Sequence, residues 1–271
     1  MALPPRQRVE VFALTAPAYL WLAATVFLPL VAMVYFSFLT AVPVGGRTAS
    51  FTLAHYISFF TKPIYWFNAW RSIELGIYVT AISLLVGYPA ALALSRHVKG
   101  RWREAIFLLI ILPFWSNALV RTFSWTMVLR QPLNLLFTYP AIVIGLVHAY
   151  LPYAILTSYI SLQAIDESLI EASRSLGATT LQTFFRIILP LSMPGVLAAI
   201  FLIFVPVIGS FMEPRILGGK DAIMLGPIIE GQFTAAFNWP LGAALSFMML
   251  AIVLLILAIA APLLRRQLGS S

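Results

Sequence analysis

Residues 189–212 read LPLSMPGVLAAIFLIFVPVIGSFM, a stretch without a charged side chain. A helix needs ~20 apolar residues to cross the hydrocarbon core of a bilayer, and this stretch is long enough. Over all 271 residues, hydrophobic side chains make up 61% and charged ones only 10%. A soluble domain is about 45–50% apolar and about 25% charged. The composition therefore predicts an integral membrane protein and excludes soluble, disordered, collagen-like and nucleic-acid-binding classes.

Six segments have the length and composition of membrane spans, and only the third contains a charge, Arg121. They are residues 11–39, 75–94, 105–129, 141–165, 189–212 and 241–264. The first is too long for the apolar core of a signal peptide, so we expect it to be retained as a span. Prolines in or beside the spans favour bent helices. We predict an all-α membrane protein in which residues 1–271 form one domain.

The connectors between the spans carry a biased set of basic residues. With the N-terminus inside, the inner segments hold ten Lys and Arg residues and the outer segments hold six. The densest cluster lies between the second and third spans, from Arg96 to Arg103. Basic residues are retained on the cytoplasmic side of membranes. The bias predicts that both termini are cytoplasmic.

The connector after the fourth span, residues 166–188, is too polar to be buried in lipid. Ser168 followed by Glu171 matches a capping box at a helix start, and Gly177 is typical of a helix stop. These signals predict a short cytoplasmic helix at 169–176, followed by a second helical stretch from Thr180 to the fifth span. On residue chemistry alone, the first helix could equally be an amphipathic helix resting on lipid headgroups.

The same connector resembles the EAA loop of ABC-importer permeases. The matching positions are Glu171, Ala172, Ser173, Gly177, Ile187 and the pair Leu189-Pro190. The resemblance implies that the loop holds a coupling helix, seated in a groove of an ATP-hydrolysing subunit. Its contact residues would then be Glu171, Ala172, Ser173 and Gly177.

Further stretches resemble the spermidine/putrescine permease (PotB-like) branch of that family. They are NALVRTFSW at 117–125, GLVH at 145–148, LGG at 217–219 and NWPLGAALS at 238–246. The resemblance implies a multi-pass permease of the bacterial inner membrane that imports polyamines by alternating access. Its partners would be a dimer of ATP-binding subunits, a second permease subunit and a periplasmic binding protein.

The residue inventory offers no catalytic machinery. There is no cysteine, and His55, His97 and His148 lack metal-ligand spacing. The sequence around Gly218-Gly219-Lys220 does not have the spacing of a phosphate-binding loop. We therefore predict a non-enzymatic subunit with no metal or cofactor of its own. ATP and Mg would bind to the partner ATPase.

Five residues are candidates for the substrate path: Trp115, Asn117, Arg121, Trp125 and Glu213. Glu213 could attract a cationic amine at the outer mouth, with Asp221 and Glu230 on the following loop. Alternatively, Arg121 and Glu213 could form a structural ion pair, or Arg121 could snorkel. The tryptophans could stack on a cation or simply anchor the helices at the interface.

Other functions remain open at this point. The resemblance also implies, as an alternative, an importer of the same class for another small solute, such as phosphonate, thiamine, iron or an opine-like compound. An ion-coupled secondary transporter is a further alternative, although such proteins place carboxylates near the bilayer midplane and none lies within the predicted spans. A membrane scaffold without transport activity would leave the EAA spacing unexplained.

Overall fold

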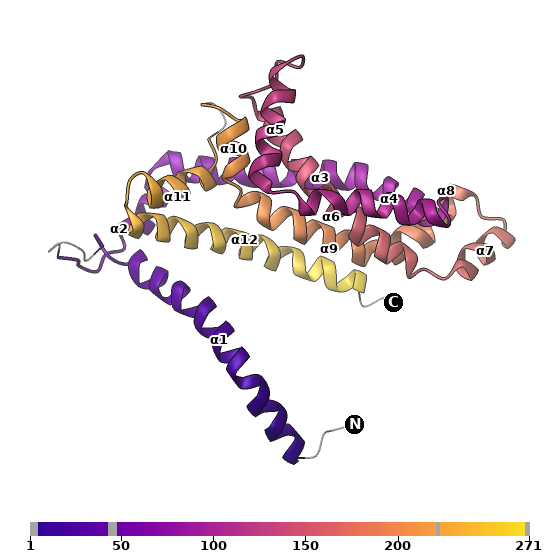
Figure 1. Cartoon of the computed structure of the whole chain (residues 1–271), viewed down its shortest axis with the longest axis horizontal. Helices are drawn as coiled ribbons and strands as arrows, with labels where there is room; N and C mark the ends of the chain where they lie inside the picture. Colours follow the sequence, from indigo (N-terminus) through magenta and orange to yellow (C-terminus); the bar gives the residue numbers. More distant parts are fainter. Residues whose placement is uncertain (1–4, 43–47, 221–222, 269–271) are drawn as a thin grey trace. The chain divides into compact units, whose positions relative to one another are not determined.

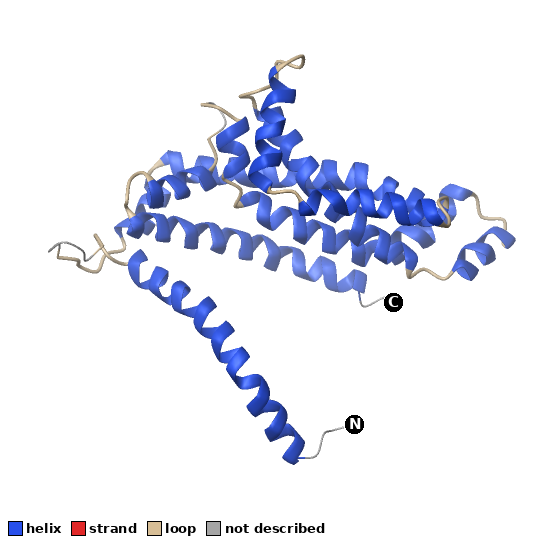
Figure 2. Cartoon of the chain, viewed as in Figure 1, coloured by secondary structure: helices blue, strands red, loops and turns tan. Residues whose placement is uncertain are grey.

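The computed structural model describes residues 5–42, 48–220 and 223–268, and this part of the chain is helical throughout, without a strand (Figure 2). The elements in chain order are α1 (Pro5–Ser37), α2 (Ala54–Thr61), α3 (Pro63–Arg96), α4 (Arg101–Ile111), the 3-10 helix η1 (Leu112–Trp115), α5 (Ala118–Arg130), α6 (Tyr139–Gln163), α7 (Glu167–Ser175), α8 (Thr180–Thr183), the π-helix η2 (Phe184–Ile188), α9 (Leu189–Ile208), α10 (Met212–Leu217), α11 (Leu225–Thr234) and α12 (Trp239–Leu268). The predicted all-α class is confirmed.

Five helical stretches within the described residues are long and apolar enough to cross a membrane. They lie in α1, α3, α6, the continuous run from α8 to α9, and α12. These stretches correspond to five of the six predicted spans. The helix α6 lies within two residues of the predicted span 141–165 at each end. By contrast, α3 begins at Pro63 and therefore extends the predicted segment 75–94 by three turns.

The remaining predicted span, residues 105–129, is wrong as one straight helix. It is divided into α4 with η1 and α5, which meet at an angle of 100°. Pro113 has no backbone N–H to continue a helical ladder, and it lies in the short η1 segment. Asn117 then begins a new helix, because its side chain accepts the backbone N–H of Leu119 at 2.8 Å. The structure has a sixth membrane span only if α4 with η1 and α5 together make one passage through the bilayer.

The chain divides into two compact units, residues 63–230 with 249–271, and residues 1–62 with 231–248. In the larger unit, α3, α6 and α9 pack side by side along much of their length (Figure 1). Their shared core includes Leu75, Ile142, Leu146 and Ile203, all fully buried. α9 approaches α6 closely at Gly195, where a Cβ atom would overlap the Thr157 carbonyl. Small residues allow such contacts between membrane helices.

The smaller unit contains α1, α2 and the beginning of α12. The Tyr56 hydroxyl donates to Ser37 Oγ at 2.8 Å, and His55 Nε2 lies 3.0 Å from the Leu39 carbonyl oxygen. These contacts hold α2 against the end of α1. All nine candidate site residues lie in the larger unit.

Candidate functional site

The loop between α6 and α9 begins with a well-formed helix start at Asp166. Its carboxylate accepts the backbone N–H of Ser168 at 2.9 Å, and its backbone is extended, as an N-cap requires. Hydrogen bonds from the Ser168 backbone and hydroxyl lower the pKa of Asp166. The predicted capping box at Ser168 and Glu171 is therefore wrong, because the helix starts earlier and Ser168 is already inside it.

The stop at Gly177 is confirmed. Gly177 has φ +81°, a left-handed conformation that glycine adopts without a steric penalty. Its N–H donates to the Arg174 carbonyl at 2.9 Å, and the N–H of Ala178 donates to the Ser173 carbonyl at 3.1 Å. This pair of bonds is a Schellman motif, which satisfies two of the free carbonyls at the end of α7.

A second helix starts immediately after this turn. Thr179 accepts the N–H of Gln182, while the Gln182 side chain accepts the N–H of Thr179 at 2.8 Å. This reciprocal pair is a capping box, and it lies at α8 rather than at α7. From there the helix continues through the π-helix η2 into α9, so the predicted second helical stretch toward the fifth span is confirmed.

The four motif residues, three in α7 and Gly177 just beyond its end, do not share one environment. Glu171, Ala172 and Gly177 are exposed, whereas Ser173 is only 7% exposed. The Ser173 Oγ lies 2.7 Å from Thr183 Oγ1, and it also donates to the Ile170 carbonyl. Ile170 is buried in a cluster with Tyr88 and Leu162. α7 thus has an outward face with Glu171 and Ala172, and an inward face with Ile170 and Ser173.

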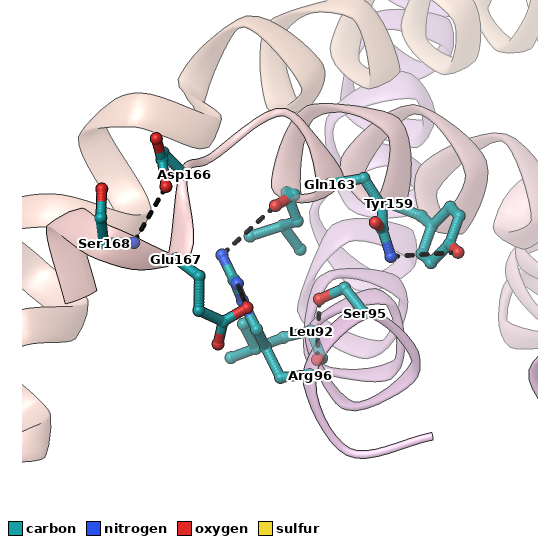
Figure 3. A network of polar contacts seen from close by, with 9 residues as sticks. Leu92, Ser95, Arg96, Tyr159, Gln163, Asp166, Glu167 and Ser168 are labelled. Carbon is teal, nitrogen blue, oxygen red and sulfur yellow. Dashed lines mark hydrogen bonds and ion pairs between the residues drawn. The ribbon is translucent and has the colours of Figure 1, made fainter. Parts of the chain in front are cut away.

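Arg96, the last residue of α3, reaches the beginning of this loop (Figure 3). Its Nη1 lies 3.3 Å from Glu167 Oε2, and its Nη2 donates to the Leu162 carbonyl at 3.3 Å. The Arg96 side chain is 16% exposed, and that of Glu167 is 72% exposed. From the sequence alone, Arg96 is not identified as a site residue and counts only among the basic residues that set the membrane orientation. Its two partners lie about 70 residues away along the chain, so no local motif points to them.

A second set of polar contacts joins α3, α6 and α9 at the other end of the loop. The Tyr88 hydroxyl of α3 lies 2.7 Å from Ser192 Oγ, at the start of α9. Ser161 of α6 donates to the Ser192 carbonyl at 3.1 Å. Both Ser192 and Tyr88 are buried. α3 and α6 therefore contact the loop where it leaves α6 and again where it enters α9.

The four candidate residues near the α4–α5 bend make different local contacts. Asn117 caps α5, and Arg121 Nη1 donates to the Pro113 carbonyl at 3.1 Å across the bend. Trp115 is 87% exposed. A cavity of about 300 Å³ lies beside the bend, and Arg121, Trp125 and His148 are among its lining residues. The structure thus brings Arg121 and Trp125 together and leaves Trp115 on the surface.

Glu213, in the first turn of α10, is half-buried and does not pair with Arg121 among the described contacts. Its Oε2 accepts a hydrogen bond from Ser210 Oγ at 2.8 Å. Further along the chain, Arg215 forms an ion pair with Glu230. Asp221, the other predicted acidic partner, lies outside the described residues.

No group of three or more His, Asp or Glu side chains in the described ranges is arranged to hold a metal ion. The arrangement instead combines the polar loop between α6 and α9 with the half-buried carboxylate of Glu213 in α10.

Comparisons with known proteins assign a family to this arrangement. Residues 83–269 match the family described as binding-protein-dependent transport system inner membrane component. The spermidine/putrescine transport system permease proteins PotB of Haemophilus influenzae and of Escherichia coli are each 35% identical over 242 residues. These matches cover 83% of this chain, with 84% of the Haemophilus protein and 87% of the Escherichia protein.

Solved structures show the same fold. A bacterial ABC transporter involved in the import of the acidic polysaccharide alginate matches with a TM-score of 0.73 at 16% identity, covering 96% of each chain. A bacterial alginate ABC transporter in complex with an alginate pentasaccharide-bound periplasmic protein matches with a TM-score of 0.72. It too is 16% identical and covers 96% of each chain, so both likenesses concern the fold alone.

Proposed function

The chain belongs to the family of binding-protein-dependent transport system inner membrane components, and from this premise we propose that it is a permease subunit of an ATP-driven importer of polyamines. The observation that carries the proposal is the 35% identity to two spermidine/putrescine permeases over most of both chains. The apolar helices fit this role, because a permease supplies the path across the bilayer.

The importer would divide its chemistry among subunits. We propose that ATP and Mg bind to a dimer of ATP-binding subunits, and that this chain makes or breaks no bond. A second permease subunit would complete the translocation path. A periplasmic binding protein would deliver the substrate, as supported by the structural neighbour solved with its periplasmic protein. The excess of basic residues in the inner connectors supports cytoplasmic termini.

The helix α7 is the proposed contact with the ATP-binding subunit. Glu171 and Ala172 are exposed on its outward face, and the small side chain at 172 permits close approach. Gly177 ends the helix and fixes its length. Ser173 would act from the inside, through its bond to Thr183. Closure of the ATP-binding subunits would displace α7 and bias the helices toward one of two states.

The substrate path is proposed to pass Glu213. A polyamine carries several positive charges, and a half-buried carboxylate attracts them more strongly than an exposed one would. Trp125 offers an aromatic face in the neighbouring cavity. Arg121 and Asn117 would shape this region by holding the α4–α5 bend, and exposed Trp115 would anchor it in the membrane interface.

Uptake by the reconstituted complex tests the function directly. The chain is purified with its ATP-binding and permease partners, placed in proteoliposomes with the binding protein, and supplied with radiolabelled spermidine. We expect uptake that requires ATP, stops with vanadate and continues when a protonophore dissipates the proton gradient. Unlabelled putrescine should compete, while phosphonate, thiamine and ferric iron should not. Uptake that follows the proton gradient and ignores ATP would contradict the proposal.

A further inference from the structure

The helix α7 is joined to the helix bundle by a short covalent link on each side. Toward α6, only the short segment 164–166 separates it from Gln163. Toward α9, the chain turns at Gly177, where a Cβ atom would meet nothing within 4 Å. Side-chain contacts between α7 and the surrounding helices add to these two links in passing a displacement of α7 to the bundle.

The Arg96 side chain makes such a contact between three helices (Figure 3). It extends from the end of α3 and donates to Leu162 in the last turn of α6. It also pairs with Glu167, the first residue of α7. A guanidinium group suits this position, because its planar fork presents several donors in fixed directions. The Leu162 carbonyl also accepts the backbone N–H of Ile165 at 3.4 Å, and a carbonyl oxygen has a second lone pair that can accept from the guanidinium.

We infer that Arg96 is a positioning residue that clamps the start of α7 to the ends of α3 and α6, so that these three elements move together when α7 is displaced. The inference rests on the proposed function, because that function supplies the displacement of α7. It adds a role to a residue outside the EAA loop.

A clamp differs from a simple stabilising contact in how much its loss changes the free energy of unfolding. Glu167 is largely exposed, and exposed ion pairs contribute little to stability. Within the described residues, Arg96 Nε is buried without an acceptor, which further limits the net gain. Removing Arg96 should therefore change the abundance and melting temperature of the protein only slightly. The main effect should fall on the coupling between ATP hydrolysis and transport.

Two substitutions at Arg96 and one at Glu167 test the clamp in the complete reconstituted transporter. Arg96→Gln removes the positive charge and the branched set of donors. Arg96→Lys keeps the charge but can donate to only one of the two acceptors. Glu167→Gln removes the negative charge in α7 and leaves the bond from Arg96 to Leu162 in place. We expect Arg96→Gln to lower spermidine uptake per ATP hydrolysed by about tenfold, a typical size for a coupling between two sites. Arg96→Lys and Glu167→Gln should give intermediate losses.

The matched control is Arg103→Gln. Arg103 is another arginine, seven residues after Arg96 in the first turn of α4, and its Nε donates to the Val98 carbonyl at 2.9 Å, between α3 and α4. Its replacement should leave the ratio of uptake to hydrolysis unchanged. Equal losses for Arg96→Gln and Arg103→Gln, or proportional losses of uptake and hydrolysis in Arg96→Gln, would overturn the inference.

A distance measurement tests the clamp without any transported substrate. The chain has no cysteine, so Ala93→Cys on α3 and Leu169→Cys on α7 can carry a unique pair of spin labels at two exposed positions. With Arg96 present, the label distance should be the same without nucleotide and with ATP and vanadate. With Arg96→Gln, it should shift or broaden on nucleotide binding.

The two readouts separate failure of the inference from failure of the proposed function. A wild-type complex that hydrolyses ATP but takes up no polyamine would reject the substrate, while the label distance would still report on the clamp. A distance that changes with nucleotide in the Arg96 protein, or that is insensitive to nucleotide in Arg96→Gln, would refute the clamp even if polyamine uptake is normal.

Discussion

The Ser173 and Thr183 hydroxyl oxygens lie 2.7 Å apart and form a buried hydrogen bond that joins α7 to α8 across the Gly177 turn. A motif residue expected to face a partner protein therefore faces the inside of its own loop. The two helices are held as one piece, which continues through η2 into α9. A force on Glu171 and Ala172 would therefore reach the start of α9 through this bond, in addition to the contacts of Arg96 with α3 and α6.

Removing one side of this bond should destabilise the loop. In Ser173→Ala, the buried Thr183 hydroxyl loses its partner, which costs about 1 kcal/mol. We expect the melting temperature of the purified complex to fall by about 2–4 °C. The double variant Ser173→Ala/Thr183→Val should recover part of this loss, because neither hydroxyl is then left alone. Ser175→Ala is the control, since Ser175 is exposed and bonds only within α7, to the Glu171 carbonyl.

At Gly177, we expect the effect of a substitution to depend on whether the new residue can adopt a positive φ, and not on the size of its side chain. A β-branched residue at φ +81° is strained by about 1–3 kcal/mol, although the space around the position is open. Gly177→Val should therefore lower ATP-coupled uptake while the protein remains in the membrane. Gly177→Asn should retain more activity, because asparagine adopts this conformation more readily.

The control for this series is Gly231→Ala, at a glycine that also has open space but no positive φ. It should leave uptake unchanged. Equal uptake by Gly177→Val and wild type would remove the turn from the coupling mechanism.

The direction of the chain in the membrane can be tested with single cysteines. The structure improves the choice of position, because Ser173 is buried and Leu176 is 88% exposed. Leu176→Cys should react with a membrane-impermeant maleimide only after lysis of spheroplasts, since the inner connectors are richer in basic residues. Thr48→Cys, exposed in the connector between α1 and α2, should react in intact spheroplasts. The reverse pattern would invert the proposed topology.

Local rules predicted some features of the loop and failed at others for identifiable reasons. The stop at Gly177 was predictable because a left-handed residue strongly favours glycine. The start was not, because Asp166 and Ser168 are both good N-caps and the choice depends on where α6 ends. The contact between Arg96 and Glu167 joins residues 71 positions apart, and no local pattern encodes it.

The broken third span shows a different limit. Hydropathy continues across residues 105–129, so composition alone predicts a single span. Pro113 and Asn117 each carry a known local signal, a missing donor and a helix cap, but each also occurs in unbroken membrane helices. In the structure the two signals fall on either side of the bend, and Arg121 donates to the Pro113 carbonyl across it.

The last prediction concerns Glu213, for which the sequence left two roles open. An ion pair with Arg121 would make the two residues depend on each other for stability. In the structure, Glu213 accepts from Ser210 and Arg121 donates to Pro113, so each has its own partner. We therefore expect no coupling between Glu213→Gln and Arg121→Gln in a double-mutant cycle that measures membrane abundance.

Uptake should respond to Glu213 through its charge. Glutamine keeps an oxygen that can accept from Ser210 but removes the negative charge, so Glu213→Gln should weaken spermidine transport by about tenfold, equivalent to ~1.4 kcal/mol. Putrescine, with fewer charges, should lose less, and added salt should narrow the difference between wild type and variant. Ser210→Ala is the matched control, because it removes the hydrogen bond and leaves the charge. If Ser210→Ala and Glu213→Gln reduce spermidine uptake equally, or if abundance in the cycle is strongly coupled, Glu213 acts through structure and does not attract the substrate.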